Sequence, residues 1–205
     1  MTTKTTAGRR VSTNIRKLAV VAMLSALAAV IQLFEIPVPA FIPEFVKLDF
    51  SELPALIASF VISPLAGIPV CLIKNIIKLT TTNSAGVGEL CNFLLGVAMV
   101  VPAGYIYKYK KTRGMALIAC LSGCIVSAVL SVFVNYFISY PVYFQVLAPE
   151  EAVLGAYKAL NPNVDNLWDA LIWFNAPFTF VKMLIDSAIT FLIYKPLSNA
   201  LKKIW

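Results

Sequence analysis

Long apolar runs separated by short polar stretches dominate the chain. A helix that crosses the ~30 Å hydrocarbon core of a bilayer needs about 20 mostly apolar residues. Four runs meet this requirement, at residues 17–34, 86–107, 115–138 and 170–194, and they predict four membrane-spanning helices. The first run also mimics a signal peptide, but it continues to Phe34, so we expect it to be retained as a span.

The segment from residue 52 to residue 79 has two interpretations. It forms one long kinked helix, or two short helices broken near Pro64, Gly67 and Pro69. Most of the 17 basic residues lie in three clusters without acidic residues, at residues 4–17, 108–113 and 195–203. The positive-inside rule places all three clusters in the cytoplasm, which requires an even number of spans between the first two. Charge therefore favours two short helices, and a five-span chain with one kinked helix remains the alternative.

These observations predict an all-α fold, an integral membrane bundle of six transmembrane helices with both termini cytoplasmic. Residues 1–205 are expected to form a single transmembrane domain, with residues 1–15 as a cytoplasmic N-terminal tail. The composition agrees, because 60% of the residues are hydrophobic, 13% are charged and the mean hydropathy is +0.82. A soluble domain carries about 25% charged residues. We attribute the net charge of +7 to cytoplasmic loops and expect no nucleic-acid partner.

Three segments are expected to face the outside, at residues 35–51, 80–85 and 139–169. The first and last are long and rich in proline and aromatic residues, such as Phe41, Phe45, Tyr140 and Trp168. Such loops either cover a binding site from outside or form an aromatic belt at the level of the lipid headgroups. Composition leaves both interpretations open.

Polar side chains at membrane depth are the candidate binding groups, because they are costly there and usually face the protein interior. Asn135, Asn175 and Thr179 lie towards the outer ends of their predicted helices. Thr179, Lys182 and Asp186 share one stripe of the last helix, where Lys182 and Asp186 could neutralise each other. Amides, hydroxyls and a lysine near aromatic rings suit a flat heterocycle that carries hydroxyl groups. Alternatively, they hold helices together.

Known catalytic motifs are absent from the sequence. There is no P-loop, no Cys/His cluster for zinc and no histidine to partner a nucleophile. An intramembrane enzyme acting on a lipid would need a pair of carboxylates, and only Glu89 and Asp186 are placed deeply enough. We expect no enzymatic activity, no cofactor and no metal site.

Several stretches together resemble one family of membrane proteins. They are Lys47-Leu-Asp-Phe-Ser-Glu-Leu-Pro-Ala55, Gly86-Val-Gly-Glu-Leu-Cys-Asn-Phe93, Asn135-Tyr-Phe137 followed by Pro141, Asn161-Pro162, and Ala176-Pro-Phe-Thr-Phe-Val-Lys182. The chain resembles the substrate-binding S components of energy-coupling factor (ECF) vitamin transporters, in particular the riboflavin-specific type. The resemblance implies a cell-membrane protein, in the bacterial plasma membrane, that captures riboflavin outside. A coupling complex of one transmembrane subunit and two ATPase subunits would then drive its delivery to the cytoplasm.

The resemblance also implies site residues. Asn135 and Lys182 carry over as ligand contacts, whereas Thr179 stands where many members have asparagine. Weaker candidates for the same site are Asn175, Asn92, Gly86, Phe45, Lys47 and Asp49. Ala22 and Ala26 form a small-xxx-small pattern that lets another helix approach closely, and in the family this surface meets the coupling subunit.

Two alternatives remain at this level. One is an S component for another vitamin, such as thiamine, folate or pantothenate. The other is the intramembrane enzyme that acts on a lipid.

Overall fold

The computed structural model describes residues 4–43, 46–82, 84–146 and 148–202, with side chains described between residues 14 and 193. Helices make up most of this part of the chain. They are α1 (Lys4–Leu33), α2 (Glu52–Val61), α3 (Gly67–Lys78), α4 (Val87–Tyr109), α5 (Arg113–Val134), α6 (Tyr140–Val146), α7 (Glu150–Leu160), α8 (Leu167–Ala170) and α9 (Ala176–Lys202). Two-residue strands β1 (Ile36–Pro37) and β2 (Lys47–Leu48) pair antiparallel in the first loop.

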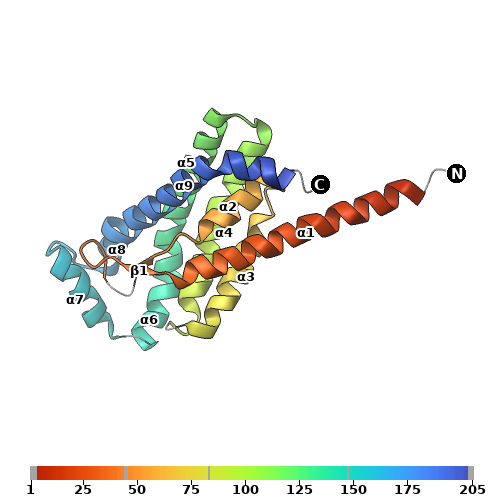
Figure 1. Cartoon of the computed structure of the whole chain (residues 1–205). Coiled ribbons are helices and arrows are strands. Elements are labelled where there is room, and N and C mark those ends of the chain that lie inside the picture. The colour runs from red at the N-terminus through yellow and green to blue at the C-terminus, as the bar shows by residue number, and fades with distance from the viewer. Residues whose placement is uncertain (1–3, 44–45, 83, 147, 203–205) are drawn as a thin grey trace.

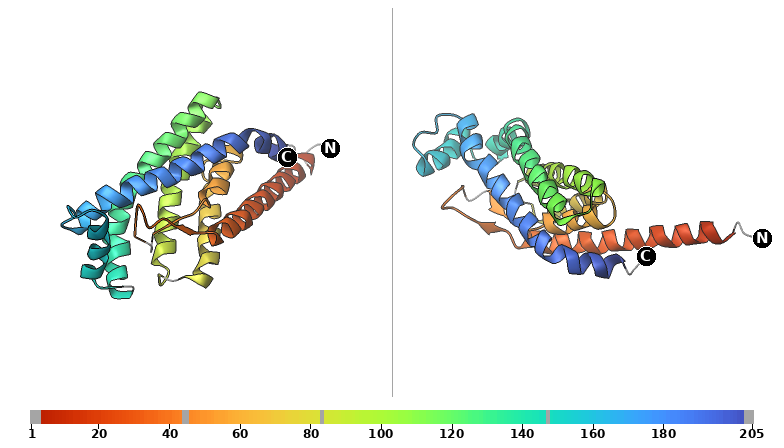
Figure 2. Two further views of the ribbon diagram at one scale, coloured as in Figure 1. Left: turned by 60° about the vertical axis from the view of Figure 1, so that its left-hand side comes forward. Right: turned by 90° about the horizontal axis from the view of Figure 1, so that it is seen from above.

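The long helices form a bundle in which most neighbours in sequence are also neighbours in space. α4 packs along α5, α5 along α9, α1 along α3, and α2 lies against α3, α4 and α9. The N-terminal part of α1 extends well beyond the bundle. The start of α1 and the C-terminal end of α9 both lie on the side away from α6 and α7 (Figures 1 and 2). The described chain ends therefore face one side of the molecule.

Two apolar clusters hold the molecule together. The inner cluster contains buried residues from six helices, namely α1, α2, α3, α4, α5 and α9. Leu24, Leu56 and Met99 are among them. The outer cluster joins the first loop to α6, α7 and α8 through Ile42, Tyr157 and other buried residues. The outer helices therefore have an apolar core of their own on top of the bundle.

The predicted break in the segment from residue 52 to residue 79 is present. α2 ends at Val61 and α3 begins at Gly67, with Pro64 between them. The two helices have 10 and 12 residues, fewer than the ~20 that a straight crossing needs. Within the described residues, four helical stretches are long and apolar enough to cross a membrane, at Asn14–Leu33, Val87–Tyr109, Arg113–Val146 and Leu167–Ile193.

One expectation about the loops needs correction. The segment at residues 139–169 is largely helical, because α7 has its own apolar face, on which Val153 and Tyr157 are buried against the outer cluster. The proline and aromatic residues of the last outer segment had indicated a loop. The burial of one face of α7 stabilises a helix there, because tertiary contacts outweigh the local preference of the sequence. The first loop contains the short β1–β2 pair, and the chain as a whole is mostly helical, as predicted.

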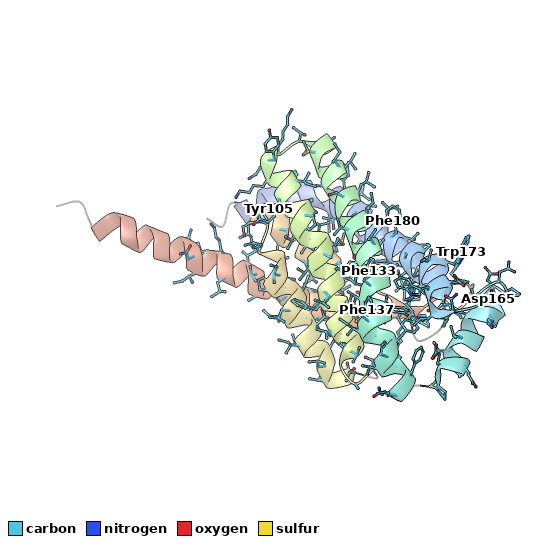
Figure 3. The ribbon with its side chains drawn as sticks, turned by 180° about the vertical axis from the view of Figure 1, so that it is seen from behind. Tyr105, Phe133, Phe137, Asp165, Trp173 and Phe180 are labelled. Atoms are coloured by element: carbon cyan, nitrogen blue, oxygen red, sulfur yellow. The ribbon has the colours of Figure 1, made fainter. Side chains whose placement is uncertain are left out.

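The outer surface of the bundle is strongly apolar. Phe133, Phe137 and Trp173 lie on the face seen in Figure 3 and are 48%, 67% and 68% exposed. Exposed apolar surface on this scale is unusual for a soluble protein. It is the surface expected where helices face lipid.

Candidate functional site

A cavity of about 300 Å³ lies between the two apolar clusters. Its walls come from the end of α1, the first loop, the end of α3, the start of α4, the turn that precedes α6, the start of α6, and the first half of α9 with the turn before it. Met183 of the inner cluster and Tyr140 of the outer cluster both line it. The volume lies at the lower end of the range for small-molecule sites.

Most of the predicted site residues line this cavity. They are Lys47, Asp49, Asn92, Asn135, Asn175, Thr179 and Lys182. They come from positions far apart in the sequence, so the fold has brought them together. Phe45, which was also predicted, lies outside the described residues.

Gly86 does not line the cavity, although Gly88 does. Gly86 is the residue before α4 and has a φ of +86°. This left-handed conformation is costly for residues with a Cβ atom. Its place in the motif is therefore explained by the turn from α3 to α4, and its role as a ligand contact stays a prediction.

Lys182 forms an ion pair across the cavity with Asp49 of the first loop. The Lys182 Nζ lies 2.7 Å from the Asp49 Oδ2 and 3.4 Å from the Asn92 Oδ1. The expected pairing with Asp186 is wrong, because the folded loop supplies a carboxylate from 133 residues away. Burial alone would raise the pKa of Asp49, but the ammonium groups of Lys182 and Lys74 outweigh this effect and hold that pKa well below its ordinary value.

A second buried ion pair adjoins the first. The Lys74 Nζ lies 2.6 Å from the Glu52 Oε1 and 2.5 Å from the Ser51 Oγ. Ser51 in turn donates its backbone N–H to Asp49 at 3.0 Å. Ser51 therefore links the two pairs into one network that ties the first loop to α2, α3 and α9, and each buried charge in it has a partner.

Asn175 belongs to a hydrogen-bonded cluster with two tyrosines. Tyr157 donates its hydroxyl to the Asn175 Oδ1 at 2.8 Å, and the Asn175 Nδ2 donates to the Tyr140 hydroxyl at 3.1 Å. Burial raises the pKa of Tyr157, which therefore stays a neutral donor. Asn175 lines the cavity with both amide atoms engaged, which makes it a positioning residue for the outer wall.

Asn135 lies at a local widening of the helix. A π-helical turn, Asn135–Ser139, follows α5, and a second one, Leu171–Asn175, precedes α9. Such turns are frequent at functional sites because they displace side chains from the regular helical ladder. The Asn135 Oδ1 accepts a hydrogen bond from Ser139 at 2.8 Å, and the amide nitrogen has no hydrogen-bond partner within the described residues. Asn135 thus retains a donor for the cavity.

Sequence analysis missed several lining residues. Glu35 lies 3.1 Å from Lys47 and 3.2 Å from Lys78, so it connects the first loop to α3. Tyr143 and Phe178 add aromatic surface to the cavity. In the sequence, Lys78 is a polar position near the end of an apolar run, and Tyr143 is one of several aromatic residues in the last outer segment. These residues line one cavity only because the first loop folds over the ends of the long helices. The sequence does not give that arrangement.

The two deep acids do not form a catalytic pair. Glu89 lines the cavity and accepts hydrogen bonds from Thr82 at 2.9 Å and Ser84 at 3.1 Å. Asp186 is fully buried and is not among the lining residues. The carboxylate pair that an intramembrane enzyme would need is therefore not assembled from these two residues.

Comparison with known families assigns the chain to a class of membrane transporter. The family model described as "ECF transporter, substrate-specific component" matches residues 16–194. The chain belongs to this family. With its long apolar helices, it is a multi-pass protein of the cell membrane.

Individual relatives agree with this assignment. The riboflavin transporter RibU of Staphylococcus aureus (strain TCH60) is 32% identical over 189 residues, which are 92% of this chain and 94% of that protein. RibU of Streptococcus thermophilus (strain ATCC BAA-250 / LMG 18311) is 32% identical over 94% of this chain and 87% of its own length. The riboflavin transporter FmnP of Bacillus subtilis (strain 168) is 39% identical over 51% of this chain and 56% of its own length.

A solved structure has the same fold. It is described as the structure and mechanism of the S component of a bacterial ECF transporter. It is 30% identical to this chain, covers 92% of this chain and 99% of its own, and superimposes with a TM-score of 0.72.

Proposed function

We propose that this chain is the riboflavin-binding S component of an ECF-type importer. The observation that carries the proposal is the cavity of about 300 Å³, in which Asn92, Asn135, Thr179 and Lys182 lie near aromatic rings. Three relatives that are named riboflavin transporters support the choice of vitamin. Riboflavin is the transported substrate in this proposal, and no cofactor is needed.

The lining suits the chemistry of riboflavin. The edge of its ring system presents donors and acceptors side by side, and an amide such as Asn135 offers both groups. The rings of Tyr140, Tyr143 and Phe178 provide apolar surface for the ring faces. The hydroxyl of Thr179 replaces an amide and either donates or accepts one hydrogen bond. In this arrangement, Lys182 and Asn92 would form hydrogen bonds with the hydroxyl-bearing side chain of riboflavin.

The proposal predicts that the detergent-purified protein is yellow and that truncating the lining groups weakens flavin binding. Asn135→Ala and Lys182→Met should each weaken binding by a factor of about 5 to 100 or more, because the loss of a buried partner costs roughly 1–3 kcal/mol. Titration followed by flavin fluorescence quenching measures the affinity. The absorbance of bound flavin separates riboflavin from thiamine, folate or pantothenate.

Matched controls come from the outer helices. Asn163→Ala and Lys158→Met remove the same groups from exposed positions and should leave the affinity unchanged. Equal affinities of all four variants would remove Asn135 and Lys182 from the site.

We also propose a six-span topology with both termini cytoplasmic and residues 1–205 as one substrate-binding domain. The three basic clusters support it, as does the common side on which the described ends of α1 and α9 lie. Lys110→Cys and Asp165→Cys test it, since both positions are exposed and the native cysteines are buried. A membrane-impermeant thiol reagent should label only Asp165→Cys in intact cells, and both after permeabilisation. The reverse pattern would contradict the topology.

The partners proposed for transport are a transmembrane coupling subunit and two ATPase subunits, in addition to the lipid bilayer. Ala22 and Ala26 are exposed on α1, on the face opposite the buried residues Leu24 and Ala28. A small-residue face of this kind permits close helix contact. We place the coupling subunit on this face, where it would drive reorientation of the loaded bundle.

A further inference from the structure

Asp186 is a buried acidic residue that does not line the cavity and, unlike Glu52, has no partner within the described residues. The residue is 0% exposed, and neither of its carboxylate oxygens has a hydrogen-bond partner within the described residues. Thr190, one turn further along α9, is also 0% exposed and has an unpartnered hydroxyl. An unpaired carboxylate at this depth is strongly unfavourable, since neither water nor a cation stabilises it.

The charged and titratable groups around Asp186 come from every element packed against it. Lys182 lies on the same helix, Asp49 on the first loop, Glu52 on α2, Lys74 on α3 and Cys124 on α5. Both ammonium groups are already held by a carboxylate, Lys182 by Asp49 at 2.7 Å and Lys74 by Glu52 at 2.6 Å. The four charges of these two pairs therefore balance without Asp186. A charge on Asp186 would add one unbalanced negative charge to this group.

We propose that Asp186 binds a proton when the first loop is closed, and that it is the second counter-ion of Lys182 when the loop opens. Lys182 and Asp186 are four residues apart on one helix, a spacing at which such side chains form ion pairs. When the loop withdraws, Asp49 leaves as a carboxylate and enters water. Asp186 then transfers its proton to water through the opened cavity and pairs with Lys182. The group of buried charges formed by Lys74, Glu52, Lys182 and its counter-ion is neutral both before and after this exchange.

Infrared spectroscopy of the full-length protein tests the proton site without any ligand. The carbonyl band of a protonated carboxylic acid lies apart from the bands of carboxylates and amides. We expect this band in the unmodified protein and in Asp165→Asn, which alters an exposed loop residue (Figure 3). The band should disappear in Asp186→Asn. Identical spectra of the unmodified protein and Asp186→Asn would overturn the proposal.

The exchange of counter-ions has its own test. Asp49→Asn removes the counter-ion that competes with Asp186, so Lys182 should take Asp186 and the protonated band should disappear. A band that persists in Asp49→Asn refutes the exchange. If a variant fails to fold, isotope labelling of the aspartate carboxyls in the unmodified chain still decides the question. A protonated aspartate band that shifts on labelling supports the site, and its absence overturns it.

One consequence rests on the proposed function. If riboflavin closes the first loop, its binding takes up as much as one proton, so the affinity should fall by up to about tenfold per pH unit as the pH rises. In the Asp186→Asn variant, the affinity for riboflavin should no longer fall as the pH rises. An unchanged pH dependence in Asp186→Asn would contradict the exchange. A protein that binds no flavin would instead refute the proposed function, and the infrared results would still decide the proton site.

Discussion

Single side chains at the cavity perform two different tasks. Asn135 has an amide nitrogen without a partner within the described residues, whereas both amide atoms of Asn175 already bond to Tyr140 and Tyr157. Lys182 combines the two tasks, because it lines the cavity and also holds Asp49 of the first loop. Residue type alone does not separate these tasks. The partners of each polar atom decide which one a residue performs.

The tyrosine cluster leads to a prediction at this scale. Tyr157→Phe removes the donor to the Asn175 Oδ1 and should weaken riboflavin binding roughly fivefold, because one lost hydrogen bond costs about 1 kcal/mol. Fluorescence titration measures the change. Tyr105→Phe is the matched control, since Tyr105 is 51% exposed on α4 (Figure 3). An affinity equal to that of the control would show that Asn175 needs no support from Tyr157.

Among the elements, the first loop has the largest effect on the site. It contributes Lys47 and Asp49 to the cavity wall, and it is fastened at two places. One is the buried Asp49–Lys182 pair, and the other is Glu35, which bridges Lys47 and Lys78 near the surface. Apolar packing of the loop comes from Ile42 and the partly buried Val46 in the outer cluster, so the loop has fewer anchors than the long helices and opens at lower cost than they do. The first loop is therefore the element expected to admit the substrate.

A change at Glu35 should affect the rate of release. Glu35→Gln weakens two partly exposed ion pairs, each worth about 0–1 kcal/mol, so riboflavin should dissociate roughly threefold faster. Stopped-flow fluorescence measures the rate, and high salt should reduce the difference between variant and unmodified protein. Glu151→Gln on the exposed face of α7 is the control. A release rate unchanged at low salt would exclude Glu35 as a fastening of the loop.

At the scale of the whole molecule, the cavity separates two packed bodies. The inner cluster joins the long helices, and the outer cluster joins α6, α7 and α8 to the first loop. The surface of the long helices is apolar, with Phe133 and Trp173 among its exposed side chains (Figure 3). A bundle with its own core and an apolar surface can change its orientation in lipid without unfolding. In the proposed function, the coupling subunit docks on one face of the bundle to drive this change.

The small-residue face of α1 provides the prediction at this scale. Changing both Ala22→Leu and Ala26→Leu should abolish riboflavin uptake by cells, because bulky side chains prevent close helix contact. Riboflavin binding by the purified variant should stay within about twofold, since neither residue lines the cavity. Val129→Leu, at a position that is 56% exposed on α5, should support normal uptake. Normal uptake by the double variant would place the coupling subunit elsewhere.

The class of fold and several residues that line the cavity could be predicted from the sequence. Apolar runs of sufficient length dictate membrane helices, and Pro64 and Gly67 divide the segment between the first and second long runs. Polar residues at membrane depth must face the interior, which is why Asn135, Thr179 and Lys182 were predictable as members of one cavity. These properties depend on local composition and on the cost of polar groups in lipid.

The tertiary structure alone decided the pairings. Lys182 had a possible partner four residues away, but the carboxylate of Asp49 reaches it from the first loop. The helical cap of α6 to α8, the bridging role of Glu35 and the structural role of Gly86 likewise depend on contacts between distant segments. Periodicity shows which face of a helix is buried and leaves open what buries it. For that reason, the sequence could not show that Asp186 has no partner. That conclusion requires the tertiary structure, in which the neighbouring lysines pair with other carboxylates.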